Sequence, residues 1–168
     1  LFGYAIAFSY AYTSLPAAIG ALLLFGSVQA TMFGHGLWKG ERMRPVQVAG
    51  YAVAVAGLVS LLLPGLSTPP LAGSVLMIAA GMAWGVYSLR GRREGDPLRV
   101  TAGNFLRTVP MALGVSVLTV SHASPDMTGI GWAVVSGAVT SGIGYSIWYS
   151  VLPKLRATNA ATLQLSVP

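Results

Sequence analysis

Long apolar segments alternate with short polar breaks along the whole chain. Five segments reach about 18 residues or more, the length at which an apolar helix spans the roughly 30 Å hydrocarbon core of a bilayer. They are Pro16 to Trp38, Pro45 to Leu63, Pro70 to Leu89, Leu98 to Val120 and Gly129 to Leu152. Two partial segments, Leu1 to Tyr12 and one starting near Ala157, flank them. The pattern predicts an all-α polytopic membrane protein, and we expect the chain to be a piece cut at both ends.

The residues at the breaks favour helix starts. Asp96-Pro97 and Thr68-Pro69 combine an N-cap with a first-turn proline, and Pro16 and Pro45 also suit first turns. Within the segments, small residues recur every fourth position, which lets helices approach closely in lipid. Examples are Gly26, Ala30 and Gly34, then Gly81 and Gly85, then Gly137 and Ser141.

Composition supports a lipid environment. The 168 residues are 54% hydrophobic and only 8% charged, against about 25% charged in average soluble domains. The absence of cysteine excludes disulfides, cysteine metal sites and cysteine nucleophiles. His35 and His122 are far apart in sequence and no metal-ligand spacing exists, so we expect neither a metal nor a cofactor.

The basic residues are distributed unevenly between the loops. Nine of the ten fall in loops 39–44, 90–99 and 154–156, whereas the alternate loops near Ser14, Gly65 and Ser124 have none. By the positive-inside rule, the basic loops are cytoplasmic in a multi-pass protein of the cytoplasmic membrane. This topology places Arg92 and Lys154 inside, and Ser67 and Ser124 outside. It also accounts for the net charge of +6, so no nucleic-acid partner is predicted.

The first and last parts of the chain resemble each other at an offset of 139 residues. The offset matches Gly3 with Gly142, Tyr10 with Tyr149, and Ala21 with Ala160. Five helices separate the two copies, and because this number is odd the copies cross the membrane in opposite directions. Inverted repeats around a midplane site are an architecture of secondary transporters.

Several motifs resemble one known family in their order and spacing. Gly36 to Gly57 contains a Gly-Glu pair, Gly40-Glu41, followed by a glycine-rich helix; Met82 to Tyr87, Asn104 to Arg107 and Ala160 to Pro168 follow. Together they resemble EamA-type members of the drug/metabolite transporter superfamily. The resemblance implies a ten-helix bundle of two inverted five-helix repeats, truncated here at both ends to about helices three to nine. Residues 1–63 would end the first repeat, and residues 70–168 would start the second. Gln29 departs from the family, which often has proline there; its repeat partner Pro168 keeps it.

Polar and aromatic residues inside the segments are the candidate substrate-binding residues. Arg107 lies about 13 Å into its segment, where a charge is costly without a cavity or partner. It meets either a substrate anion, with Asn104 beside it, or it snorkels or binds helix carbonyls near Pro110. Gln29 either contacts substrate or joins helices. Trp84 and Tyr145 lie deep enough to line a site.

These features predict a secondary transporter of small metabolites, such as amino acids, that works by alternating access and is not an enzyme. The partners are the lipid bilayer and a small-molecule substrate. The alternatives are a membrane-embedded enzyme, which would need a constellation around Arg107, Gln29 and the histidines, and a structural membrane subunit. All four acidic residues fall in loops or at helix ends, and Glu41 is interpreted as a helix-end charge that pairs with Arg42 or Arg44.

Overall fold

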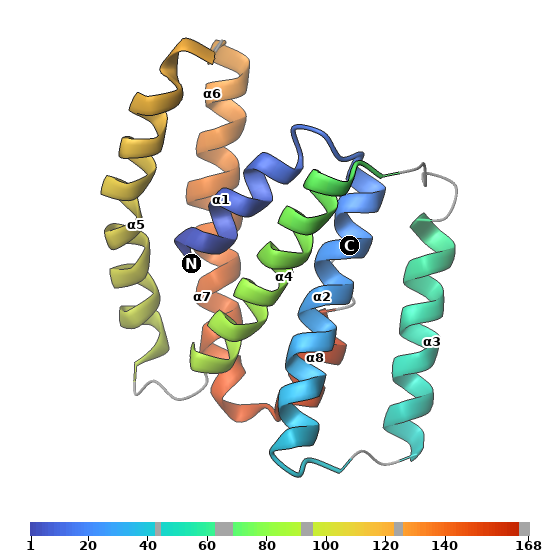
Figure 1. The fold of residues 1–168 in the computed structure, drawn as a ribbon. Coiled ribbons are helices and arrows are strands. Elements are labelled where there is room, and N and C mark those ends of the chain that lie inside the picture. Colours follow the sequence, from blue (N-terminus) through green and yellow to red (C-terminus); the bar gives the residue numbers. More distant parts are fainter. Residues whose placement is uncertain (43–44, 63–68, 92–95, 123–125, 165–168) are drawn as a thin grey trace. The chain divides into compact units, whose positions relative to one another are not determined.

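The computed structural model describes residues 1–42, 45–62, 69–91, 96–122 and 126–164, and every element within them is a helix (Figure 1). The all-α prediction is therefore confirmed for these residues. Contacts divide the chain into two compact units, which are described separately. Unit 1 comprises Gly3–Arg90 and the chain from Leu155 onward, and unit 2 comprises Gly91–Lys154.

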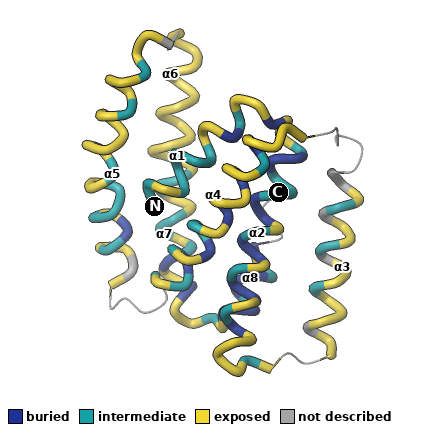
Figure 2. Tube along the Cα trace, viewed as in Figure 1, coloured by how far each residue is buried: buried dark blue, intermediate teal, exposed yellow. Residues whose placement is uncertain are grey.

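Unit 1 is built around its second helix. Its helices are α1 (Phe2–Ala11), α2 (Ala17–Trp38), α3 (Pro45–Leu62), α4 (Leu71–Gly91, whose last residue falls in unit 2) and α8 (Ala157–Gln164). The helix α2 packs against α3 and α8, and its buried residues form a nearly continuous face (Figure 2). By contrast, α3 is exposed or half-buried along its described side chains. These bounds agree within two residues with the segments predicted from sequence.

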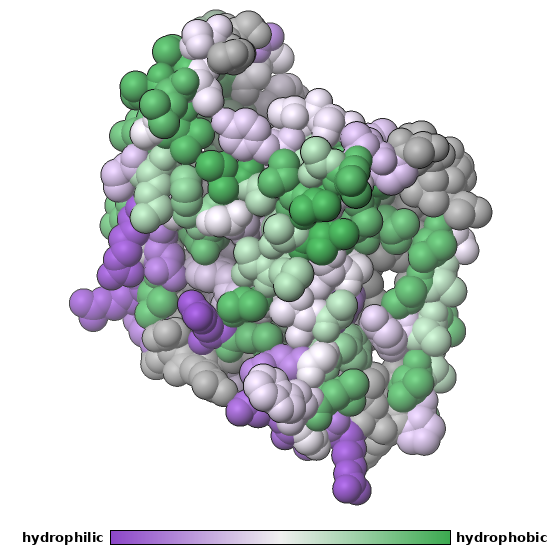
Figure 3. Space-filling model, viewed as in Figure 1, coloured by the Kyte–Doolittle hydropathy of each residue, from purple (hydrophilic) through white to green (hydrophobic). Residues whose placement is uncertain are grey.

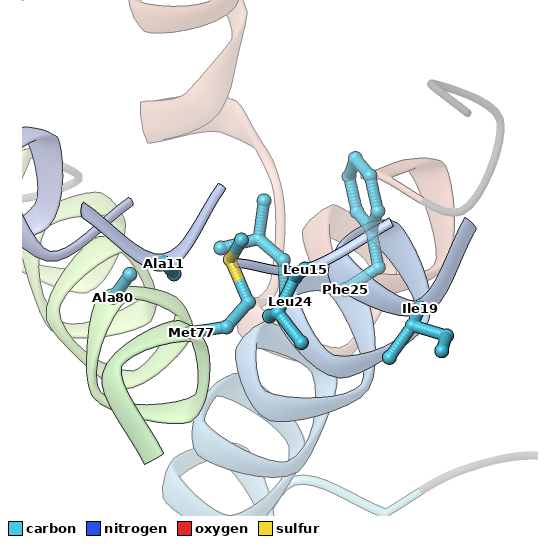
Figure 4. Packing of buried hydrophobic residues seen from close by; sticks show 7 residues of the cluster. All are labelled: Ala11, Leu15, Ile19, Leu24, Phe25, Met77 and Ala80. Carbon is cyan, nitrogen blue, oxygen red and sulfur yellow. The ribbon is translucent and has the colours of Figure 1, made fainter. Parts of the chain in front are cut away.

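The apolar core of unit 1 joins α1, α2 and α4. The Met77 side chain from α4 lies against Leu15 and Leu24, with Ala11 and Ala80 beside it (Figure 4). Met77, Ala11 and Ala80 are fully buried. Methionine suits this position because its unbranched, flexible side chain fills irregular gaps between helices.

Two glycines let α4 approach α2 closely. A Cβ on Gly81 would lie 2.6 Å from both the Leu24 carbonyl oxygen and the Ser27 Cβ, and one on Gly85 would lie 2.8 Å from the Thr31 Cβ. The predicted small-residue packing is confirmed at this stripe, whereas no described atom lies within 4 Å of a Cβ at Gly26, Gly34 or Gly137. Because later residues of α4 contact later residues of α2, the two helices run parallel.

The basic residues described in unit 1 share one end of it. Lys39 follows α2, and Arg90 lies at the end of the parallel helix α4. Arg156 precedes α8, which begins where α2 ends. Figure 3 shows hydrophilic side chains at this lower end and hydrophobic side chains along α3 and α4. The membrane side of this end remains a prediction; Arg44, Arg92, Arg93, Ser67 and Ser124 lie outside the described residues.

Unit 2 consists of two helical columns. The first is α5 (Pro97–Thr119) with the 3-10 turn η2 (Val120–His122), and the second runs through α6 (Met127–Val134), η3 (Val135–Ser141), α7 (Gly142–Val151) and η4 (Leu152–Lys154). Asp96 and Asp126 cap α5 and α6 by accepting the backbone N–H groups of Arg99 and Gly129. The predicted N-cap and first-turn proline at Asp96-Pro97 are therefore confirmed, whereas Thr68 lies outside the described residues.

Three described helical stretches are long and apolar enough to cross a membrane: Ala17–Trp38, Leu71–Gly91 and Met127–Lys154. The 23-residue helix α5 has sufficient length but is less apolar, because Asn104 and Arg107 lie within it. The interior Pro110 of α5 has no N–H, so it leaves the carbonyl four residues earlier without its usual helical partner.

Candidate functional site

Gln29 lies in the interior of unit 1, on the buried face of α2. It is only 2% exposed, and its Nε2 donates a hydrogen bond to the Ala161 carbonyl oxygen of α8. This bond agrees with the helix-joining role for Gln29 proposed from sequence. The same side chain also has a free acceptor, because its buried Oε1 has no hydrogen-bond partner among the described residues. The amide nitrogen therefore joins α2 to α8, and the amide oxygen remains able to accept a hydrogen bond.

Trp84 lies in an aromatic cluster formed by α1, α2 and α4. Its ring centroid is 5.2 Å from that of Tyr4 and 6.0 Å from that of Phe25. Tyr4 also contacts Phe8 at 5.5 Å. The indole Nε1 of Trp84 is buried and has no acceptor among the described residues. The cluster thus combines several aromatic faces with one unused hydrogen-bond donor.

Gln29 and Trp84 share the neighbourhood of Phe25. Gln29 follows Phe25 by four residues on α2, so both side chains lie on the same helix face, and the Phe25 ring contacts Trp84. Gln164 on α8 adds a second amide that is 2% exposed, with neither its Oε1 nor its Nε2 hydrogen-bonded to a described residue. A buried polar group left unpaired costs about 1–3 kcal/mol. Each of these unpaired donors and acceptors is a group that a polar ligand would satisfy.

Arg107 and Asn104 pair with each other on α5. The Arg107 Nη1 donates to the Asn104 Oδ1 at 3.3 Å, and the guanidinium is exposed within this chain. The Arg107 side chain therefore extends back toward the start of α5, away from Pro110. Its direction agrees with snorkelling, and the prediction that Arg107 and Asn104 meet a substrate anion stays a prediction. That Arg107 lies at a central cavity stays a prediction.

Tyr145 connects the two columns of unit 2. Its ring meets that of Phe105 on α5 edge-on at 5.4 Å, and it stacks on Tyr149 at 5.8 Å. Tyr145 follows η3, a π-helical stretch in the middle of the second column. π-helical turns are rare and occur often at functional sites. The five residues predicted from sequence thus divide into two sets, Gln29 and Trp84 in unit 1, and Arg107, Asn104 and Tyr145 in unit 2.

Glu41 makes a long-range contact that the sequence analysis missed. Its carboxylate accepts the backbone N–H groups of Ala157 and Thr158, each at 3.1 Å, and the Thr158 hydroxyl at 3.0 Å. The turn that delivers it is a Schellman motif, in which Gly40 has φ +80° and the Glu41 N–H bonds the Gly36 carbonyl oxygen. Glu41 therefore caps a helix that begins 116 residues later; its predicted pairing with Arg42 stays a prediction, and Arg44 lies outside the described residues.

One sequence feature could have indicated this contact. The helices that start at Pro97 and Met127 are each preceded by an aspartate that caps them locally. The residue before α8 is Arg156, whose carbonyl accepts the first bond of that helix from the Ala160 N–H. Arginine cannot accept the orphan N–H groups of a first turn. A helix start without a local cap requires an acceptor from elsewhere.

The predicted absence of a metal site remains a prediction. No group of three or more histidine, cysteine or acidic side chains occurs in the searched, described part of the chain.

The model of the EamA-like transporter family matches residues 71–168, more than half of the chain. The chain belongs to the EamA-like transporter family. Membership makes it part of an integral membrane transporter, which the apolar helices fit, and it confirms the drug/metabolite transporter resemblance. The EamA chain is also similar over 99% of its length to a solved crystal structure, with a TM-score of 0.82, 26% identity and 60% of that protein covered.

Curated relatives cover most or all of this EamA chain. An uncharacterized protein of Pseudomonas aeruginosa is 51% identical over the entire chain, which spans 58% of that relative. The aromatic amino acid exporter YddG of Ancylobacter novellus is 30% identical over 88% of the chain and 54% of its own length. A probable amino-acid metabolite efflux pump of Escherichia coli is 25% identical over the whole chain and 64% of its own length. The chain therefore spans less than two thirds of each.

Proposed function

We propose that the protein containing this chain is a secondary transporter that moves small polar or amphipathic metabolites, with amino acids as the first class to test, across the cytoplasmic membrane by alternating access. It is a carrier and not an enzyme. Its basic loops face the cytoplasm, by the positive-inside rule. The observation that carries the substrate class is two buried polar atoms without partners among the described residues: the Gln29 Oε1 acceptor, one helical turn from Phe25, and the Trp84 Nε1 donor, on the ring that contacts Phe25.

The chemistry of this set suits an amphipathic molecule. An ammonium group donates hydrogen bonds to an amide oxygen such as the Gln29 Oε1, and a carboxylate accepts from an indole N–H. The rings of Tyr4, Phe25 and Trp84 offer faces to apolar or aromatic side chains and to cations. Ligand sites that are mostly apolar, with a few placed polar groups, have this composition. The amino-acid exporters among the relatives support the same class.

Transport by the full-length protein in proteoliposomes tests the proposal. We expect uptake of at least some members of a panel of labelled amino acids, with accelerated exchange when unlabelled substrate is present on the opposite side. The variant Trp84→Phe keeps an aromatic ring but removes the N–H donor. We expect it to lower kcat/KM by at least about tenfold, since one hydrogen bond to a charged group contributes about 1.5–3 kcal/mol.

Trp132→Phe is the matched control, because Trp132 is 70% exposed within this chain. We expect its transport to equal that of the parent at equal membrane abundance. Equal transport by both variants would remove Trp84 from the site. A parent protein that moves none of the amino acids would exclude them as the substrate class.

A further inference from the structure

Glu41 joins two helices that lie in different predicted repeats of the transporter. The helix α2 belongs to the first predicted repeat, and α8 to the second. The three hydrogen bonds accepted by the Glu41 carboxylate join the C-terminal end of α2 to the N-terminal end of α8. This junction lies at the end of unit 1 that has the basic residues Lys39 and Arg156. It is thus a contact between the repeats at one end of the helix pair.

Another hydrogen bond between α2 and α8 lies deeper. Gln29 bonds the Ala161 carbonyl farther along both helices and is almost fully buried. The Glu41 bonds are only partly buried. Ala157 and Thr158 are 0% and 5% exposed in the capped state, so their N–H groups escape becoming buried orphans only if α8 moves and admits water as the carboxylate leaves. Loss of the cap is therefore coupled to opening of this end, because the carboxylate cannot leave a closed junction without the penalty of unpaired, buried N–H groups.

The local sequence is arranged for this one contact. Gly40 supplies the left-handed turn, with φ +80°. Gly36 supplies the space, since a Cβ there would lie 3.0 Å from both the Glu41 Oε2 and the Thr158 Cγ2. The negative carboxylate also lies at the positive end of the α8 dipole. Gly36, Gly40 and Glu41 together thus provide α8 with the N-terminal cap that its own neighbouring residues do not supply.

We propose that Glu41 is a positioning residue of the transport cycle, a detachable cap that closes the basic end of the α2–α8 pair and releases α8 when that end opens. The proposal rests on the alternating-access function proposed above. In the capped state the first turn of α8 is held against α2, which keeps Ala161 beside Gln29. Removing the cap shifts the population toward the state that is open at the basic end.

Two cysteine reporters can measure this shift, because these 168 residues contain no cysteine and any cysteine elsewhere in the protein is first replaced by serine. Ala160→Cys reports on the capped end, and Ala11→Cys reports on the other end, where α1 stops; both alanines are fully buried. Maleimide labelling is measured in the whole protein in proteoliposomes, without substrate. In the Glu41→Gln variant we expect Ala160→Cys to label at least about tenfold faster and Ala11→Cys to label more slowly.

Asp126→Asn is the matched control, because Asp126 is also an N-capping carboxylate but caps its own helix. We expect it to change neither labelling rate by more than about twofold. Faster labelling of both reporters in Glu41→Gln would mean general loosening and would overturn the proposal, as would unchanged rates. Glu41→Asp keeps the charge on a shorter side chain and should restore part of the protection. Since labelling needs no substrate, a parent that fails to transport would refute the carrier function separately.

Discussion

Replacing Gly81 with alanine should separate α4 from α2 and destabilise the protein. The added Cβ would lie 2.6 Å from the Leu24 carbonyl oxygen and the Ser27 Cβ, and 3.2 Å from the Val28 backbone nitrogen. None of these atoms is the end of a flexible side chain, so none can rotate away. Ordinary contact begins at 3.4 Å, and α4 would have to retreat by about 0.8 Å, which forfeits a quarter to a half of the dispersion energy along the interface.

The magnitude follows from this geometry. Overpacking a close helix contact costs about 1–3 kcal/mol. For a protein of this size or larger, that cost lowers the melting temperature by about 3–10 °C. The assay is thermal unfolding of the purified protein in detergent. It is read as the loss of monodisperse protein after heating and needs no knowledge of the substrate.

Gly26→Ala is the control for Gly81→Ala. Gly26 lies on α2, and a Cβ there would have no described atom within 4 Å. Alanine there should be neutral or stabilise the helix by up to about 1 kcal/mol. Equal melting temperatures for the two variants would refute the close approach of α4 to α2.

Three further predictions concern single positions in the chain. Gln29→Leu should raise stability by about 1 kcal/mol, measured by thermal unfolding, since removal of the buried, unpaired Oε1 (about 1–3 kcal/mol) outweighs loss of the bond to the Ala161 carbonyl (about 1 kcal/mol); a loss of stability would show that the bond outweighs the unpaired acceptor. Arg107→Ala should reduce transport at equal membrane abundance, and Arg107→Lys should recover less than half of it, since lysine lacks the planar fork that reaches Asn104; full recovery by lysine would indicate snorkelling alone. Cysteine at Lys154 should resist an impermeant thiol reagent in intact cells whereas cysteine at Ser14 should react, and the opposite result would invert the topology.

The helix boundaries were predictable because the chain marks them with strong local chemistry. Asp96-Pro97 fixes the start of α5 through one carboxylate bond and one constrained φ. The lengths of the apolar segments predicted where α2 and α4 begin and end, since the bilayer sets the length of a spanning helix. The π-helical stretch Val135–Ser141 was not predicted. This stretch consists of small and apolar residues that suit an α-helix equally well. Nothing in the order of these residues distinguishes the hydrogen bonds of a π-helix from those of an α-helix.

The candidate site could be predicted only in part from the sequence, because the hydrogen-bond partners of its residues lie on distant segments of the chain. Gln29 was identified by its polarity, but its bond to Ala161 spans 132 residues. Glu41 was assigned to nearby arginines, since sequence distance was the only guide to its partners. Trp84 was identified by its depth, but the unpaired state of its indole nitrogen depends on how α1 and α2 pack around it.

The meeting of α2 and α8 in unit 1 has a consequence for the inverted repeat. The two helices begin at equivalent positions, Ala17 and Ala157, within one residue of the 139-residue offset, and they run in opposite directions, as inversion requires. Applied to the bond between Gln29 and Ala161, the offset gives a contact between residue 168 and Leu22. The sequence has Pro168 there, which lies outside the described residues and has no amide to donate. The sequence therefore predicts this polar bond on one side of the proposed repeat axis only. For the alternating-access carrier proposed above, in which inward- and outward-facing states exchange the roles of the repeats, this asymmetry predicts unequal energies for the two states.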